Sequence, residues 1–233
     1  MSIESVLTPR LRAIADCIPS GAVVADVGTD HGYIPVYLCK TGQIERGLAM
    51  DLRPGPLSRA QHNIERYGLT GQIETRLSDG LVALQIGEAD TAVIAGMGGL
   101  LIAQILEQAP FYLDAYILQP MTATAELRQY LESHGYRITH ERLAREDDKL
   151  YTIMTVKRGT MYIPEPVFYQ VGQRLMANRD PLTPMLIAGL LTKYRQTLLG
   201  LAHSNRDTVE EKKEHISYMI QALEALEEVC KTW

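Results

Sequence analysis

Residues 23–32 decide the fold, and they read Val23-Val24-Ala25-Asp26-Val27-Gly28-Thr29-Asp30-His31-Gly32. An apolar run that ends in an acidic residue and then passes through two glycines predicts a buried strand followed by a tight loop. A new amphipathic pattern begins at Tyr33, so a helix follows, and its first turn directs free N–H groups at the strand end. This arrangement is typical of a cradle for a nucleotide-like ligand, although an ordinary turn of a parallel α/β protein has the same pattern.

The chemistry of this loop favours one class of cofactor. The dinucleotide fingerprint is absent, because Asp30 stands where its third position requires glycine. A carboxylate there repels a pyrophosphate and attracts a cation, and S-adenosylmethionine carries both a sulfonium and an ammonium. We therefore expect S-adenosylmethionine, with cofactor contacts from Asp26, Gly28, Thr29, Asp30 and Gly32.

Composition limits the remaining possibilities. The 233 residues, 46% of them apolar, fit one domain with an appendage. Neither a leader sequence nor an apolar run of roughly 20 residues is evident, so we expect a cytoplasmic protein with no membrane partner. Its three cysteines are far apart and lack close histidines, which argues against a disulfide framework or a metal site. With a net charge of −5, nucleic acid contacts must use a local patch.

Strand and helix patterns alternate along the first two thirds of the chain. Strands are expected over residues 23–27, 47–51, 73–77, 91–95 and 115–120. Helices are expected over residues 7–15, 33–38, 53–67, 100–106 and 124–134. Two final β-rich runs, 137–143 and 150–157, follow each other through residues 145–149 without a helix, which predicts an antiparallel hairpin.

Residues at the ends of these predicted elements extend the candidate cofactor site. Asp51 lies 23 residues after Gly28 at the tip of the neighbouring strand, where a carboxylate can accept both ribose hydroxyls, and Leu52 follows it. This spacing fits NAD enzymes as well as methyltransferases. Asp79-Gly80 can place a carboxylate near the adenine amino group, although the same pair is common in turns.

Two further features flank the cradle. Arg10, on the leading helix, can reach a ligand carboxylate or remain solvated. Residues 96–99, Gly96-Met97-Gly98-Gly99, place three glycines in four positions, which indicates the close approach of a flat or bulky group, or a tight turn.

Five βα repeats followed by a hairpin are the plan of the Rossmann-like class I methyltransferase domain, a seven-stranded sheet whose last strand is antiparallel. The chain also carries a specific combination of short motifs. They are Arg10-Leu11, Asp26-x-Gly28-Thr29-Asp30-His31-Gly32-Tyr33-x-Pro35, Asp79-Gly80-Leu81, Ala95-Gly96-Met97-Gly98-Gly99 and Leu118-Gln119-Pro120. Together they resemble the TrmK family of bacterial tRNA (adenine(22)-N1)-methyltransferases. Met121 stands where that family usually has asparagine, and Gly172-Gln173 where it has Gly-Pro.

The resemblance implies methyl transfer from S-adenosylmethionine to N1 of adenine 22 in the tRNA D-arm. N1 has a free lone pair, so positioning supplies most of the catalysis, and the base must first be extruded. The product is cationic, which makes Asp30 the candidate for stabilising its charge. His31 either hydrogen-bonds the base or is structural. Gly96 and Met97 are expected beside the base, and Gly96 also beside the cofactor.

Residues 160–233 form the predicted appendage, with a boundary after Gly159. Two helices, 184–203 and 208–231, carry matching apolar seams and predict an antiparallel coiled-coil hairpin. Between Pro166 and Arg206 the only acid is Asp180. The basic residues in that interval are Arg174, Arg179, Lys193, Arg195 and Arg206. We expect Arg174, Arg179, Lys193 and Arg195 to hold tRNA phosphates, with a salt-bridged coil or a homodimer contact as alternatives.

Two other classes of function stay open at this point. An NAD-dependent oxidoreductase would share the strand-end Asp51, but the chain lacks pyrophosphate glycines and a hydride-transfer residue. A non-catalytic protein that binds adenosylmethionine or RNA would share the whole cradle.

Overall fold

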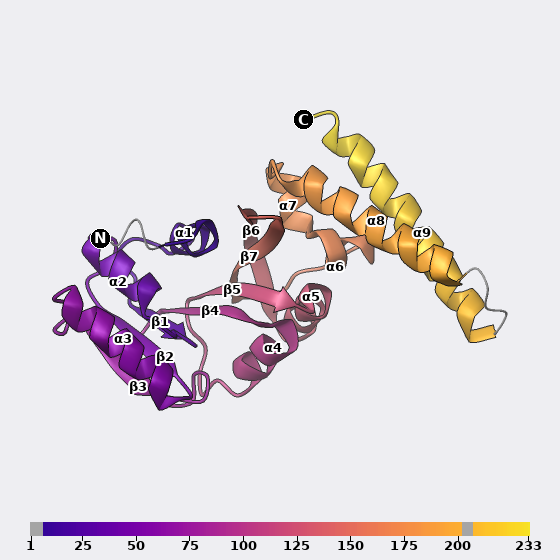
Figure 1. Ribbon diagram of the computed structural model, residues 1–233. Helices are drawn as coiled ribbons and strands as arrows, with labels where there is room; N and C mark the ends of the chain where they lie inside the picture. Colours follow the sequence, from indigo (N-terminus) through magenta and orange to yellow (C-terminus); the bar gives the residue numbers. More distant parts are fainter. Residues whose placement is uncertain (1–6, 202–206) are drawn as a thin grey trace. The chain divides into compact units, whose positions relative to one another are not determined.

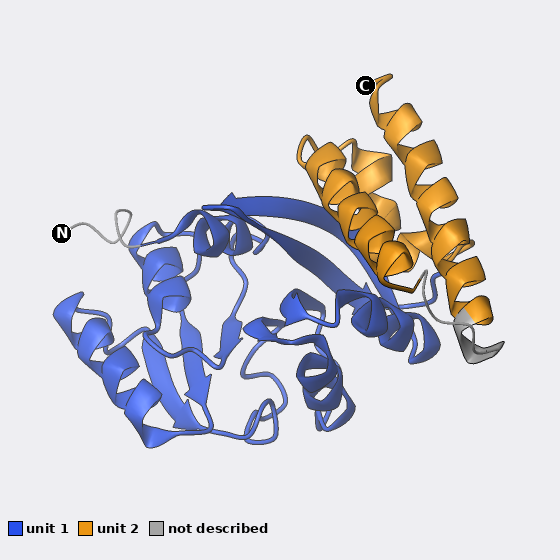
Figure 2. Ribbon diagram, turned by 45° about the vertical axis from the view of Figure 1, so that its right-hand side comes forward, with its two compact units in different colours: residues 1–162 blue, residues 163–233 orange. Residues whose placement is uncertain are grey.

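The computed structural model describes residues 7–201 and 207–233. The chain divides into two compact units, residues 1–162 and residues 163–233 (Figure 2). The boundary expected from the sequence, after Gly159, falls shortly before this division. Each unit is described by itself.

A seven-stranded sheet in the order β3-β2-β1-β4-β5-β7-β6 forms the first unit (Figure 1). The strands are β1 (Val24–Val27), β2 (Gly47–Asp51), β3 (Ile73–Leu77), β4 (Thr91–Gly98), β5 (Ala115–Thr122), β6 (Tyr136–Glu146) and β7 (Lys149–Arg158). β1 pairs in parallel with β2 on one side and β4 on the other. β7 is antiparallel to β5 and β6. This order confirms the class I methyltransferase plan.

Helices cover both faces of this sheet. They are α1 (Pro9–Ala15), α2 (Tyr33–Lys40), α3 (Pro54–Arg66), α4 (Gly99–Glu107) and α5 (Thr124–Ser133). One apolar cluster joins α1, α2 and α3 to the sheet, and a second joins α4 and α5 to it. Each layer therefore buries one apolar face of a sheet whose inner strands are buried on both sides, as parallel sheets require.

The first helix begins at Pro9, two residues after the expected start at residue 7. Thr8 caps α1 by accepting the N–H of Leu11 at 3.4 Å, and Pro9 occupies the first turn, where a missing N–H costs nothing. The cap fixes where α1 starts and so places Arg10 one residue into the helix.

Four strands are longer than expected. β4 continues beyond Ala95 to Gly98, because Met97 and Gly98 still pair with β5 across an irregular register. β5 likewise continues to Thr122. β6 and β7 extend to a two-residue turn at 147–148, so most of the expected 145–149 connection is strand.

The glycines around the end of β4 differ in their surroundings. A Cβ on Gly99 would lie 2.3 Å from the carbonyl oxygen of Ala123, and one on Gly98 would lie 3.2 Å from Thr122 Oγ1. These two glycines let the start of α4 approach the chain's own β5–α5 connection. Gly96 is exposed, and a Cβ on it would meet only Arg10 Nη1, at 3.9 Å, so of the three glycines Gly96 is the one that fits an approach by a ligand.

The second unit contains α6 (Val167–Val171), α7 (Gln173–Asn178), α8 (Thr183–Leu201) and α9 (Asp207–Cys230). α8 and α9 pack together as the predicted hairpin, with seam residues such as Ile187, Leu191, Met219 and Leu223 buried. The short helix α6 joins the same cluster and was not expected from the sequence. Arg206, counted in the basic interval, lies outside the described residues.

Candidate active site

A cavity of about 360 Å³ opens at the carboxyl ends of β1 and β4. Its lining comes from α1, from β1 and the loop after it, from the start of α2 and from β4. The lining residues are Arg10, Leu11, Asp26, Gly28, Thr29, Asp30, His31, Tyr33, Ile34, Ala95 and Gly96. Seven of these were predicted as site residues, so the structure brings together one half of the candidate site.

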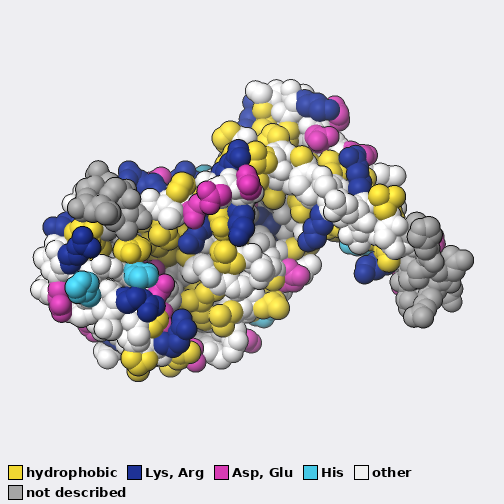
Figure 3. All heavy atoms as spheres, in the orientation of Figure 1, with side chains coloured by type: hydrophobic (Ala, Val, Ile, Leu, Met, Phe, Trp, Pro, Cys, Tyr) yellow, Lys and Arg dark blue, Asp and Glu magenta, His cyan; other side chains and the backbone are white. Residues whose placement is uncertain are grey.

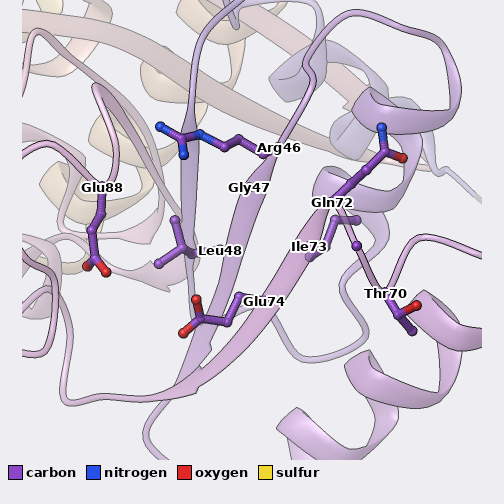
Figure 4. A pocket seen from close by; sticks show the side chains of 9 residues that line it. Arg46, Gly47, Leu48, Thr70, Gln72, Ile73, Glu74 and Glu88 are labelled. Carbon is purple, nitrogen blue, oxygen red and sulfur yellow. The ribbon is translucent and has the colours of Figure 1, made fainter.

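A second, larger cavity of about 410 Å³ lies where β2 and β3 begin (Figure 4). Its two carboxylates, Glu74 and Glu88, are both held in ion pairs by Arg76. In open α/β sheets, ligands bind outside the carboxyl ends of the strands, and this cavity lies at the opposite ends. We therefore place the active site in the smaller cavity.

Asp26 closes the floor of the site and is almost fully buried. Thr29 Oγ1 donates to Asp26 Oδ2 at 2.5 Å. Burial raises the pKa of Asp26 to about 6, the hydrogen bond from Thr29 opposes that rise, and the nearby charge of Asp51 adds to it. The carboxylate is therefore costly to ionise, and a bound cation offsets that cost.

The loop after β1 has a left-handed backbone at three positions. Gly28 (φ 72°), Asp30 (φ 45°) and Gly32 (φ 67°) all have positive φ, which favours glycine and is tolerated by aspartate. A Cβ on Gly32 would lie 3.3 Å from the Cβ of Ala60 on α3, so the loop is packed closely against that helix.

Helix α3 also holds the loop through polar contacts. Arg59 forms an ion pair with the carboxylate of Asp30. Asn63 Nδ2 donates to the carbonyl oxygen of His31 at 2.9 Å. His31 Nε2 lies 3.6 Å from the Asp30 carboxylate, and its ring stacks on Tyr33 with centroids 5.0 Å apart. No sequence pattern pointed to Arg59 or Asn63, because both lie about 30 residues from the loop that they hold.

The other half of the predicted site lies at the ends of β2 and β3, outside the cavity. Asp51 is buried, and its Oδ1 accepts the N–H of Arg53 at 2.9 Å. Leu52 and Asp79 are exposed, and Gly80 is buried with φ 57°. The N–H of Gly28 donates to the carbonyl oxygen of Met50, which ties the loop after β1 to the end of β2.

Met97, on β4, packs against the loop after β1. A Cβ on Gly28 would lie 2.2 Å from Met97 Cε, so the thioether packs directly on the glycine of the loop. Met97 also packs against the apolar cluster on the α4 face of the sheet. The absence of a side chain at Gly28 thus makes room for Met97 as well as for a ligand.

The donor set fits an adenosine that carries a sulfonium and an amino acid. Asp51 can accept two ribose hydroxyls, the buried Asp26 suits a cationic group, and Arg10 suits a carboxylate. Gly96 is exposed and lines the same cavity as Asp26 and Arg10. Within the described residues, no group of three or more His, Cys, Asp or Glu could hold a metal ion. The helices described there also include none that is long and apolar enough to cross a membrane.

Strand order and donor set together define a class I S-adenosylmethionine-dependent methyltransferase. The Methyltransferase domain family matches residues 7–154. The tRNA (adenine(22)-N(1))-methyltransferase of Bacillus subtilis is 38% identical over 159 residues, which cover 67% of each chain. The chain belongs to the TrmK family of tRNA (adenine(22)-N1)-methyltransferases.

Two solved structures resemble the chain along almost its whole length. M. capricolum TrmK, solved with S-adenosyl-homocysteine, has a TM-score of 0.82 at 28% identity and covers 96% of this chain and 99% of its own. A Streptococcus pneumoniae protein solved with S-adenosyl-L-methionine has a TM-score of 0.78 at 31% identity and covers 95% and 99%. Both likenesses extend through the helical unit, and the oxidoreductase alternative is not favoured.

The raised pKa of Asp26 predicts how stability changes with pH. The pKa is about 6 in the folded chain and about 3.9 when unfolded, so the contribution of Asp26 to stability is greatest below pH 4 and is lost as the pH rises through 6. Asp26→Asn should remove this fall. In urea unfolding at pH 7.5 we expect the variant to be more stable, by on the order of 3 kcal/mol at most.

The matched control is Asp79→Asn, which changes an exposed carboxylate at the end of β3 and should stay within about 0.5 kcal/mol of the parent. If the Asp26→Asn protein has the same pH dependence of unfolding as the parent, the assignment of the slope to Asp26 is wrong.

Proposed function

We propose that the protein transfers the methyl group of S-adenosylmethionine to N1 of adenine 22 in tRNA. The proposal is supported by the cavity at the carboxyl ends of β1 and β4, found in a chain that belongs to the TrmK family. The B. subtilis relative is named for this reaction and this position. The non-catalytic alternative is less favoured, since the cavity reaches Gly96, which is exposed to an approaching base.

The chain's own residues act mainly by positioning. When bound, the cofactor supplies the electrophilic methyl group. Asp51 and the loop 28–32 hold its nucleoside end, while Asp26 and Arg10 hold its amino-acid end. N1 of adenine needs no base to activate it, so the rate depends on holding N1 in line with the methyl group.

The proposal is tested with unmodified tRNA, S-adenosylmethionine and the full-length protein. Mass spectrometry of the nucleosides should reveal 1-methyladenosine and no N6-methyladenosine, and primer extension should stop at position 22. A tRNA with guanine at position 22 is the control and should gain no methyl group. Formation of 1-methyladenosine in that control would contradict the position, and its absence with the natural tRNA would contradict the activity.

Asp30 is our candidate for stabilising the positive charge that develops on the base. It lines the cavity and its carboxylate is half exposed, so it can face a bound base while it pairs with Arg59. We expect Asp30→Asn to lower kcat by tenfold or more, with a change in cofactor affinity of less than about threefold.

Arg59→Gln is the matched control for Asp30→Asn, because it breaks the same ion pair and leaves the carboxylate charge in place. Stopped-assay kinetics and calorimetry with S-adenosyl-homocysteine separate the two effects. Equal losses of kcat and cofactor affinity in Asp30→Asn would make Asp30 a cofactor ligand instead.

We further propose that the helical unit binds tRNA phosphates through Arg174, Arg179, Lys193 and Arg195. All four are exposed, and Lys and Arg side chains are spaced along the visible face of the helical pair (Figure 3). Arg195 already pairs with Glu224 at 2.7 Å, so part of its charge is used within the hairpin. Lys193, among the described side chains, has no charged partner, which makes it the clearer candidate.

Lys193→Glu should weaken tRNA binding by several-fold at low salt, with a smaller difference at high salt, because phosphate contacts release counterions. Lys212→Glu makes the same charge change on the exposed face of α9 and is the matched control. Filter binding at two salt concentrations measures both. Equal effects of the two variants would contradict specific binding of tRNA by α8. They would favour the alternative role, in which the hairpin joins two copies of the chain.

A further inference from the structure

Gln119 is the fully buried polar residue at the end of β5, and all its hydrogen-bonding atoms are in use. Its Oε1 accepts from Arg10 Nη1 at 2.8 Å and from the N–H of Gly96 at 3.2 Å. Its Nε2 donates to the carbonyl oxygen of Pro120 at 2.8 Å. One amide therefore joins α1, the end of β4 and the end of β5.

Gly96 needs this contact because of the irregular end of β4. The register of β4 against β5 shifts between Ala95 and Met97, and Gly96 is left out of the ladder with φ 78°. A backbone N–H in that position must find a partner elsewhere, and the side chain of Gln119 provides it. The bulge that exposes Gly96 to the cavity is thus fixed by Gln119.

Arg10 is held from several sides. Its backbone N–H donates to Glu146 Oε2 at 3.1 Å, and its guanidinium lies 5.4 Å from the centre of the Tyr151 ring. Of the five N–H donors on a guanidinium, the contact with Gln119 occupies one and leaves donors for a carboxylate. Arg10 Nη1 would also lie 3.9 Å from a Cβ on Gly96, so the two partners of Gln119 are neighbours at the cavity wall.

We propose that Gln119 is a positioning residue that sets Arg10 and the Gly96 bulge in one arrangement. It thereby couples recognition of the cofactor's amino-acid carboxylate to the placement of the target base. The inference rests on the proposed function and adds to it the residue on which both halves of the reaction depend.

The neutral amide is essential to this role. A glutamate at 119 would still accept from Arg10 and Gly96, but its charge would neutralise Arg10 in competition with a ligand carboxylate. It would also lose the donation to Pro120. A methionine of similar size would leave the N–H of Gly96 without a partner and Arg10 without its anchor. Both changes act on the carboxylate end of the cofactor and leave the nucleoside contacts at Asp51 unaltered.

Two ligands separate this role from general support of the fold. S-adenosyl-homocysteine has the amino-acid group, and 5′-methylthioadenosine shares its nucleoside and thioether but lacks that group. In calorimetry with the full-length protein, Gln119→Glu and Gln119→Met should bind S-adenosyl-homocysteine at least tenfold more weakly. Binding of 5′-methylthioadenosine should change less than twofold. Arg10→Gln should reproduce this pattern, and its effect combined with Gln119→Met should be less than the product of the two single effects, because both act on one contact.

Equal losses for the two ligands, or no loss for either, would overturn the proposal. If the two Gln119 variants fail to fold in thermal melts, Gln119→Asn keeps the amide with a side chain one methylene shorter and should show the same selective loss. The unchanged protein is the reference. Selective loss by the variants supports the inference even if tRNA proves not to be methylated at adenine 22, whereas a parent protein that binds neither ligand contradicts the proposed function itself.

Discussion

The site depends on the reversal of strand order at β1. Its parallel pairing with β2 on one side and β4 on the other sends the following connections to opposite faces of the sheet. The loops that leave β1 and β4 therefore diverge, and the space between them cannot be filled by either helical layer. The cavity lies at this opening, and the predicted residues that follow β2 and β3 lie along the same edge, because the carboxyl ends of parallel strands all reach one edge. The antiparallel β7 extends the same sheet and carries, through the β6–β7 hairpin, the side chains that hold Arg10.

The first unit contains two kinds of buried charge. Arg128 and Glu141 are almost fully buried and form an ion pair at 2.8 Å, which joins α5 to β6 and satisfies both charges within the fold. Removal of one partner of such a pair costs about 3–5 kcal/mol, so the pair specifies how the layer packs. Within residues 7–201 and 207–233, the hydroxyl of Thr29 is the one hydrogen-bond donor to the Asp26 carboxylate. Its ionisation is unfavourable in the free protein, and a cationic ligand would supply a partner for the charge.

Much of the fold follows from patterns that are local in sequence. Apolar runs ending in acids mark strands, glycines mark their ends, and the Thr8-Pro9 pair marks the start of α1; each depends on a few adjacent residues. The details that pairing between distant segments decides were not accessible in this way. The strand at Ala95 continues because β5 is alongside it, and Gly99 packs on Ala123 because two connections meet there. The contact between Arg10 and Gln119 spans 109 residues. The sequence showed this contact only indirectly, through the presence of the polar Gln119 inside the apolar run of β5.

The backbone at Asp30 shows how the loop combines structure and chemistry. Its φ of 45° is a conformation that glycine adopts without strain, and the dinucleotide fingerprint has glycine at that position. A side chain there costs roughly 1 kcal/mol, a cost that the ion pair with Arg59 offsets only in part, because exposed pairs contribute little. Stability alone would therefore favour glycine at position 30. The carboxylate places a negative charge at the mouth of a cavity suited to a cationic cofactor and to a base that becomes cationic. This balance supports the role in the reaction that we propose for Asp30.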